Sequence, residues 1–185
     1  MKILDRLPLP TQTETITFGS RHVRFHRDEI LVWLSIGLLG ERDPRRISPP
    51  FPAVLDTGNG APFYLHEYHL IDWTGIRPTL LALRGTKKVN QQHVPFHEAD
   101  VWIHPNTPGT WKRALGKQPF RLELEEGIAI GPPVPNQPPF PRVPLLGVAA
   151  LRSNKLDFWF DSKPARCHVW TAGWRSKIVR LLCRI

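Results

Sequence analysis

The chain has 185 residues, of which 41% are hydrophobic, so it is long and apolar enough to bury one sizeable core. Its formal net charge of +9 at pH 7 raises the question of nucleic acid. The basic residues are scattered and match no nucleic-acid-binding motif, which makes that partner a less favoured alternative. The longest apolar stretch, Ile30 to Gly40, is too short to cross a bilayer, and the N-terminus shows no secretory signal. We therefore expect a cytoplasmic protein with no membrane partner.

Twenty prolines and thirteen glycines interrupt the chain, which favours short strands joined by turns. The first predicted elements are strands at 14–19 and 22–26, which form a hairpin, and a buried strand at 30–37. The prediction is one all-β domain over residues 1–185. Its core covers about residues 13–171, and a basic tail follows at about 172–185. Two cysteines, Cys167 and Cys183, are too few for a disulfide framework and are expected as free thiols.

The middle of the chain alternates between apolar runs and glycine- or proline-bearing turns. A strand is predicted at Phe51 to Leu55, and a short helix after Tyr64 with Gly75 as its C-cap. The next predicted pair of strands has its turn near Gly85.

Two further alternating segments, at 98–105 and 120–133, precede a proline-rich stretch at Pro132 to Pro144. That stretch is interpreted as a loop, because the residues after it are too few for a second domain. The last predicted unit is a strand, a short helix and a strand from Leu145 to Asp161.

One apolar strand ends on a carboxylate, Asp56, and is followed at once by Thr57 and Gly58. A buried acid beside a second acid can share a proton with it. The ionised partner then activates water, while the protonated partner donates a hydrogen bond to the scissile carbonyl. A glycine at 58 lets the backbone approach the carboxylate, and the Thr57 hydroxyl can bond to backbone across the site.

The Asp56-Thr57-Gly58 segment and the sequence Leu145 to Gly147, about ninety residues later, together resemble the retropepsin-like aspartic proteases. In that family a D-T-G strand is crossed by a later segment of two hydrophobic residues and a glycine. The resemblance covers roughly Thr13 to Thr171. It implies a closed-barrel acid protease fold with one or two short helices. It also implies an aspartic-type endopeptidase that hydrolyses peptide or protein substrates without a cofactor or metal.

The resemblance assigns roles to individual residues. Asp56 is the catalytic acid, Thr57 braces the two active-site loops, and Gly58 lies beside the carboxylate. The structural segment that packs behind the site is Leu145, Leu146 and Gly147.

The chain has a single D-T-G, so the resemblance implies a symmetric homodimer in which each subunit contributes one Asp56. The candidate flap over the substrate is Leu83 to Gln91 with Gly85 at its tip. Asn59 departs from the family, which usually has Ala or Ser after the glycine.

Three other interpretations compete with a protease. The first is a catalytically inactive dimeric peptide-binding or scaffolding module with the same fold. In a purely structural role, Asp56 would cap backbone N–H groups in a turn. The second is a metal site, although the histidine spacing does not fit a metalloprotease helix; its candidate ligands are His66, His69, His93, His97 and His104, with Glu67 or Glu98 as base.

The third interpretation assigns ligand-stacking roles to the seven tryptophans, most of which are instead expected in the core. They are Trp33, Trp73, Trp102, Trp111, Trp159, Trp170 and Trp174, with Trp111 and Trp174 expected to be the most exposed.

Overall fold

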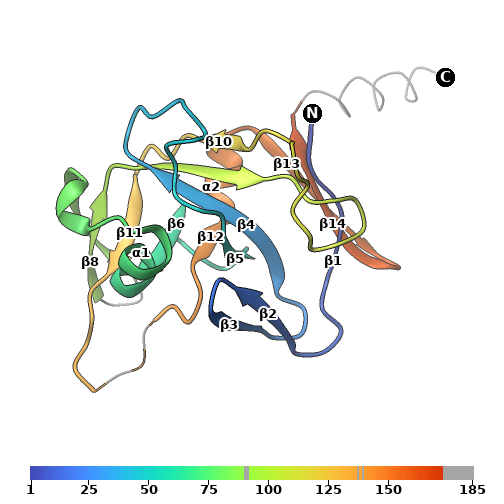
Figure 1. The fold of residues 1–185 in the computed structure, drawn as a ribbon, viewed down its shortest axis with the longest axis horizontal. Helices are drawn as coiled ribbons and strands as arrows, with labels where there is room; N and C mark the ends of the chain where they lie inside the picture. The colour runs from blue at the N-terminus through green and yellow to red at the C-terminus, as the bar shows by residue number, and fades with distance from the viewer. Residues whose placement is uncertain (90–91, 137, 139, 173–185) are drawn as a thin grey trace.

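The computed structural model describes residues 1–89, 92–136, 138 and 140–172, and these form a mostly β protein with two short α-helices (Figure 1). The predicted all-β class is thus confirmed. The elements are β1 (Lys2–Pro8), β2 (Glu14–Phe18), β3 (Arg21–Phe25), β4 (Ile30–Gly37), β5 (Phe51–Asp56), β6 (Phe63–His66), α1 (Glu67–Thr74), a 3₁₀ turn (Pro78–Leu80), β7 (Leu83–Val89), β8 (Gln92–His97), β9 (Asp100–His104), β10 (Phe120–Leu122), β11 (Ile128–Gly131), β12 (Leu145–Gly147), α2 (Val148–Ser153), β13 (Leu156–Ser162) and β14 (Ala165–Thr171).

The main sheet has nine strands in the order β10-β9-β4-β5-β12-β6-β11-β8-β7. Strands β4 and β5 pair antiparallel at its centre, and both are largely buried, which is why they read as continuous apolar runs. The two edges, β10 and β7, do not pair with each other. The described strands therefore form no closed barrel, and that expectation was wrong. Strand β10 has only three residues, and β7 is exposed along most of its length.

The predicted hairpin of β2 and β3 and the predicted helix α1 are both confirmed, and they pack together against the main sheet. Gly75 ends α1 in the left-handed conformation, with φ 74°, and its N–H bonds back to the carbonyl of Ile71. The Trp73 ring lies between hairpin and sheet: its centroid is 5.5 Å from that of Phe18 and 6.3 Å from that of Phe51.

Strand β1 was missed by the sequence analysis, and it corrects the N-terminal limit of the core from about residue 13 to Lys2. It pairs with β14 in a three-stranded sheet, and its side chains Ile3, Leu4 and Leu7 are buried in the main core. Two register shifts interrupt this pairing, and Arg6 has a positive φ of 50°. These irregularities break the period-two alternation by which strands are recognised.

We expect Leu4→Ala to lower the free energy of unfolding by about 2–5 kcal/mol, because a fully buried side chain is replaced by a cavity. Urea unfolding followed by tryptophan fluorescence measures the loss. Leu115→Ala is the control, since Leu115 is 84% exposed, and it should change stability by less than about 0.5 kcal/mol. Equal stability of the two variants would show that β1 is not part of the core.

The tryptophans are distributed differently from the prediction. Trp73, Trp102 and Trp170 are buried, as expected, but Trp111 is only partly exposed and its indole N–H donates to the carbonyl of Pro8 at 2.7 Å. The exposed ring is instead that of Trp159, at 45%.

Both Trp174 and Cys183 lie outside the described residues, as does almost all of the predicted basic tail. Cys167 is a buried free thiol, and burial raises its pKa to about 12. In the described part of the chain, no helix has the length and apolar character needed to cross a membrane.

Candidate active site

The structure brings together the two segments that were singled out in the sequence. Strand β12 lies between β5 and β6, parallel to β5 and antiparallel to β6. Leu146 is paired with Leu55 and Gly147 with Asp56, so the carboxylate stands at the end of two adjacent parallel strands. The later segment that was singled out in the sequence thus lies beside the D-T-G strand.

Gly147 is required by the close approach of the loop that follows Asp56. A Cβ atom at this position would lie 2.1 Å from the carbonyl oxygen of Ala61 and 3.0 Å from that of Asn59. The Gly147 N–H donates to the carbonyl of Pro62 at 2.9 Å. The glycine therefore allows β12 to lie directly against the loop that follows Asp56.

The Asp56 side chain organises the turn that follows it. The Gly58 N–H donates to Asp56 Oδ1 at 2.8 Å, and the Asn59 N–H donates to the Asp56 carbonyl at 3.3 Å. This is an Asx-type turn, so the capping role proposed as an alternative is present. Asp56 nevertheless remains partly exposed, and Thr57 and Gly58 are exposed. One oxygen of the carboxylate is thus held by the backbone while the group as a whole is still accessible to solvent.

Asn59 has a role that the sequence analysis did not find. Its side chain is buried, its Nδ2 donates to the carbonyl of Leu145 at 3.4 Å, and its Oδ1 accepts from the N–H of Ala61 at 3.3 Å. Asn59 therefore joins the loop that follows Asp56 to β12. Ala or Ser at this position would be too short to make both bonds. The only sequence signal was its departure from the family pattern.

The candidate flap is an antiparallel hairpin of β7 and β8, but Gly85 is not at its tip. Gly85 lies inside β7, where it pairs with Phe96. A register shift separates Leu83 from Gly85, and the φ of Gly85 is 154°, so the glycine marks a β-bulge instead of a turn. Val89 at the end of β7 pairs with Gln92 at the start of β8, and residues 90–91 lie outside the described set.

A pocket of about 330 Å³ lies between this hairpin and the proline-rich loop. Tyr64 lines it from β6 and is paired with Leu145 of β12, so the pocket adjoins the strands that carry the site. Phe140 of the loop also lines it, and its ring centroid is 5.9 Å from that of Tyr64. Asp56 does not line it. The full lining is Tyr64, His66, Gln92, Pro132, Val134, Pro138 and Phe140.

The histidines are used for structure. His66 Nδ1 accepts from the N–H of Tyr68, and His69 Nδ1 accepts from the N–H of His66, so the pair caps the start of α1. His69 Nε2 donates to the carbonyl of Arg142. Burial lowers the pKa of His69 to about 4, and it likewise lowers that of His104, whose Nε2 lies 2.8 Å from Ser35 Oγ, to about 4.

The predicted metal-ligand set is not assembled. Within the described ranges, which include all five candidate histidines, no three His, Cys, Asp or Glu side chains are close enough to hold a metal ion.

The lowered pKa values of His69 and His104 predict that the folded protein loses stability in acid. An ordinary histidine in the unfolded chain has a pKa near 6.5, so between pH 6.5 and 4 the unfolded state binds more protons than the folded state. Lowering the pH from 7 to 5 should therefore reduce the free energy of unfolding by about 1–2 kcal/mol for each histidine. Urea unfolding at successive pH values measures the slope, and His104→Gln should remove its share. A constant stability over this window would contradict the prediction.

Comparisons of the chain with protein-family models, with curated proteins and with solved structures find no significant match.

Proposed function

We propose that this protein is an aspartic endopeptidase of the retropepsin-like type, active as a homodimer in which two copies of Asp56 form the catalytic pair. The observation that carries the proposal is the pairing of Gly147 with Asp56 and of Leu146 with Leu55. Two segments about ninety residues apart, each chosen for its sequence alone, lie side by side with the carboxylate at their common end.

The chemistry follows from two carboxylates that share one proton. Asp56 of one subunit, ionised, takes a proton from water as the water oxygen attacks the carbonyl carbon of the peptide. The partner subunit's Asp56, protonated, donates a hydrogen bond to the carbonyl oxygen, which becomes the oxyanion. The C–N bond then breaks and the amine leaves with a proton from the pair. No metal or covalent enzyme intermediate is needed.

The accessibility of the loop supports assembly across a two-fold axis. Asp56 is partly exposed and Thr57 is exposed, and the Thr57 hydroxyl makes no hydrogen bond within the described part of the subunit. A single subunit offers one such carboxylate, which is half of the required pair. A second copy of the loop, related by the two-fold axis, would supply the second carboxylate. Its backbone would also offer a hydrogen-bond partner to each Thr57 hydroxyl.

The hairpin and its pocket support an extended peptide as the substrate. Among the described strands none pairs with the outer edge of β7, and an extended chain binds readily beside a strand through main-chain hydrogen bonds. The 330 Å³ pocket beneath the hairpin, lined largely by Tyr64, Phe140 and prolines, is suited to an apolar side chain of that peptide.

The direct test is digestion of a diverse peptide mixture from pH 4 to 7, with products identified by mass spectrometry and subunit association measured by sedimentation. We expect internal cleavage by the dimer, with activity limited to a pH range in which the pair holds one proton. Because His69 and His104 are expected to destabilise the fold in acid, folding is checked at each pH. A folded dimer that cuts no peptide would contradict the proposal that the protein is an endopeptidase.

The second candidate is a catalytically inactive peptide-binding module of the same architecture. The bond from the Gly58 N–H to Asp56 Oδ1 favours it, because a carboxylate with a capping role explains the Asp-Thr-Gly turn without any reaction. Binding of peptides to the folded dimer without cleavage would support this alternative.

A further inference from the structure

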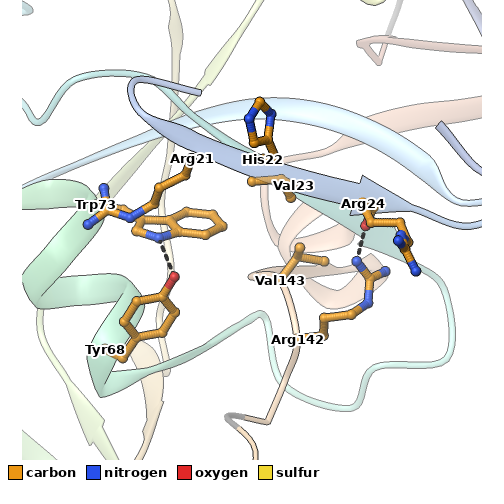
Figure 2. Close-up of a pocket in the computed structure, with 8 residues that line it drawn as sticks. All are labelled: Arg21, His22, Val23, Arg24, Tyr68, Trp73, Arg142 and Val143. Carbon is orange, nitrogen blue, oxygen red and sulfur yellow. Dashed lines mark hydrogen bonds between the residues drawn. The ribbon is translucent and has the colours of Figure 1, made fainter. Parts of the chain in front are cut away.

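A second pocket, of about 550 Å³, lies between β3, α1 and the segment just before β12. It shares no lining residue with the pocket under the hairpin, and Asp56 does not line it. Figure 2 shows Val23 and Val143 at its centre, Arg21 with Trp73 on one side, and Arg24 with Arg142 on the other.

The charge of the lining is one-sided. The described residues that line it include three arginines and no acidic residue. Two of them have carboxylate partners: Arg21 lies 3.6 Å from Asp72, and Arg142 bonds to both oxygens of Glu29 at 2.9 Å. Arg24 is exposed and makes no ion pair within the described residues. The rim therefore keeps an uncompensated guanidinium group.

The guanidinium of Arg142 is held in place before any ligand arrives. Besides the contact with Glu29, its Nη1 donates to the carbonyl of Arg24, and its own carbonyl accepts from His69 Nε2. Its Nε–H makes no hydrogen bond to any residue that the structure describes, and Arg21, whose contact with Asp72 is long, keeps donors available as well. Guanidinium groups fixed in this way bind carboxylates and phosphates through paired hydrogen bonds.

The floor of the pocket is apolar and aromatic. Val23, Val143 and Trp73 are buried, and the indole N–H of Trp73 donates to the hydroxyl of Tyr68 at 3.0 Å, so that polar atom is already satisfied (Figure 2). A polar ligand without an apolar part would gain nothing from this surface. A ligand with a flat or aliphatic body would cover it while its charged end reached the arginines.

We propose that this pocket binds a small molecule in which an aromatic or apolar body carries one oxyanion group, a phosphate or a carboxylate. The oxyanion lies between Arg24 and Arg142, and the body rests on Val23, Val143 and Trp73. The site is separate from the Asp56 loop and independent of peptidase activity.

Isothermal titration calorimetry of the full chain tests the proposal with four probes: phenyl phosphate, benzoate, inorganic phosphate and phenol. We expect saturable binding of phenyl phosphate or benzoate, whichever carries the preferred oxyanion, and weaker binding of inorganic phosphate and of uncharged phenol. Arg24→Gln should weaken the preferred probe by at least about tenfold, because a charge-assisted hydrogen bond is lost. The backbone carbonyl that holds Arg142 is retained in this variant.

Arg27→Gln is the matched control, because it removes the same charge from a neighbouring exposed position that does not line the pocket. It should leave binding unchanged. Asp56→Asn should also bind as the wild type does, which separates this site from the proposed peptidase. The proposal is overturned if neither aromatic anion binds saturably, or if the two arginine variants weaken binding equally.

Discussion

Asp56→Asn is expected to abolish peptide cleavage, with a loss of at least about a thousandfold in kcat/KM. Asparagine has nearly the same shape, and its side-chain oxygen can still accept the hydrogen bond from the Gly58 N–H. In the proposed mechanism the carboxylate carries the charge that activates water and shares a proton with a second Asp56, and the amide can do neither. The variant should therefore keep its fold and its association while losing the reaction.

Asp157→Asn is the control for this experiment, because Asp157 is an exposed carboxylate on β13. The same mixture of peptides is digested by the three proteins, and initial rates are compared at the pH of highest wild-type activity. Wild-type and Asp157→Asn protein should cut at equal rates. If Asp56→Asn retained more than about a tenth of the activity, Asp56 would not be a catalytic residue.

Gly147→Ala is expected to destabilise the protein by about 3 kcal/mol or more, since the added methyl group meets main-chain atoms that cannot rotate away. The carbonyl oxygen of Ala61 would lie 2.1 Å from it. Strand β12 or the active-site loop would have to move, and either movement separates Asp56 from its neighbouring strand. Any variant protein that still folds should also have lower activity.

Gly60→Ala lies in the same loop and is the matched control, because a Cβ atom there has no neighbour within 4 Å. Its free energy of unfolding should change by less than about 1 kcal/mol. Denaturant unfolding of both variants gives the comparison. Equal stabilities would mean that β12 does not lie against the loop as described.

Most of the strands could be predicted because their residues alternate in polarity or form short apolar runs. The β2–β3 hairpin, β4, β5 and α1 with its cap at Gly75 all follow from local patterns. The position of β12 beside β5 could not come from local pattern, because three residues pair with a strand about ninety positions earlier. It was expected only from the resemblance to a family.

The errors have local physical causes. Strand β1 was missed because its two register shifts break the alternation. The hairpin turn was assigned to Gly85 because glycine marks turns and bulges equally well in a sequence. The arginine pocket could not be predicted from the sequence. Arg142 lies more than a hundred residues after Arg21 and Arg24, and the two segments come together only in the folded chain.

Mixing of active and inactive subunits tests the central claim most directly. Wild-type and Asp56→Asn chains are unfolded together, refolded at several ratios with total protein held constant, and assayed for cleavage. If each active site needs two copies of Asp56, activity follows the square of the wild-type fraction, and an equal mixture keeps about one quarter of it. Activity in direct proportion to the wild-type fraction, about one half in that mixture, would show that one subunit suffices and would contradict the account.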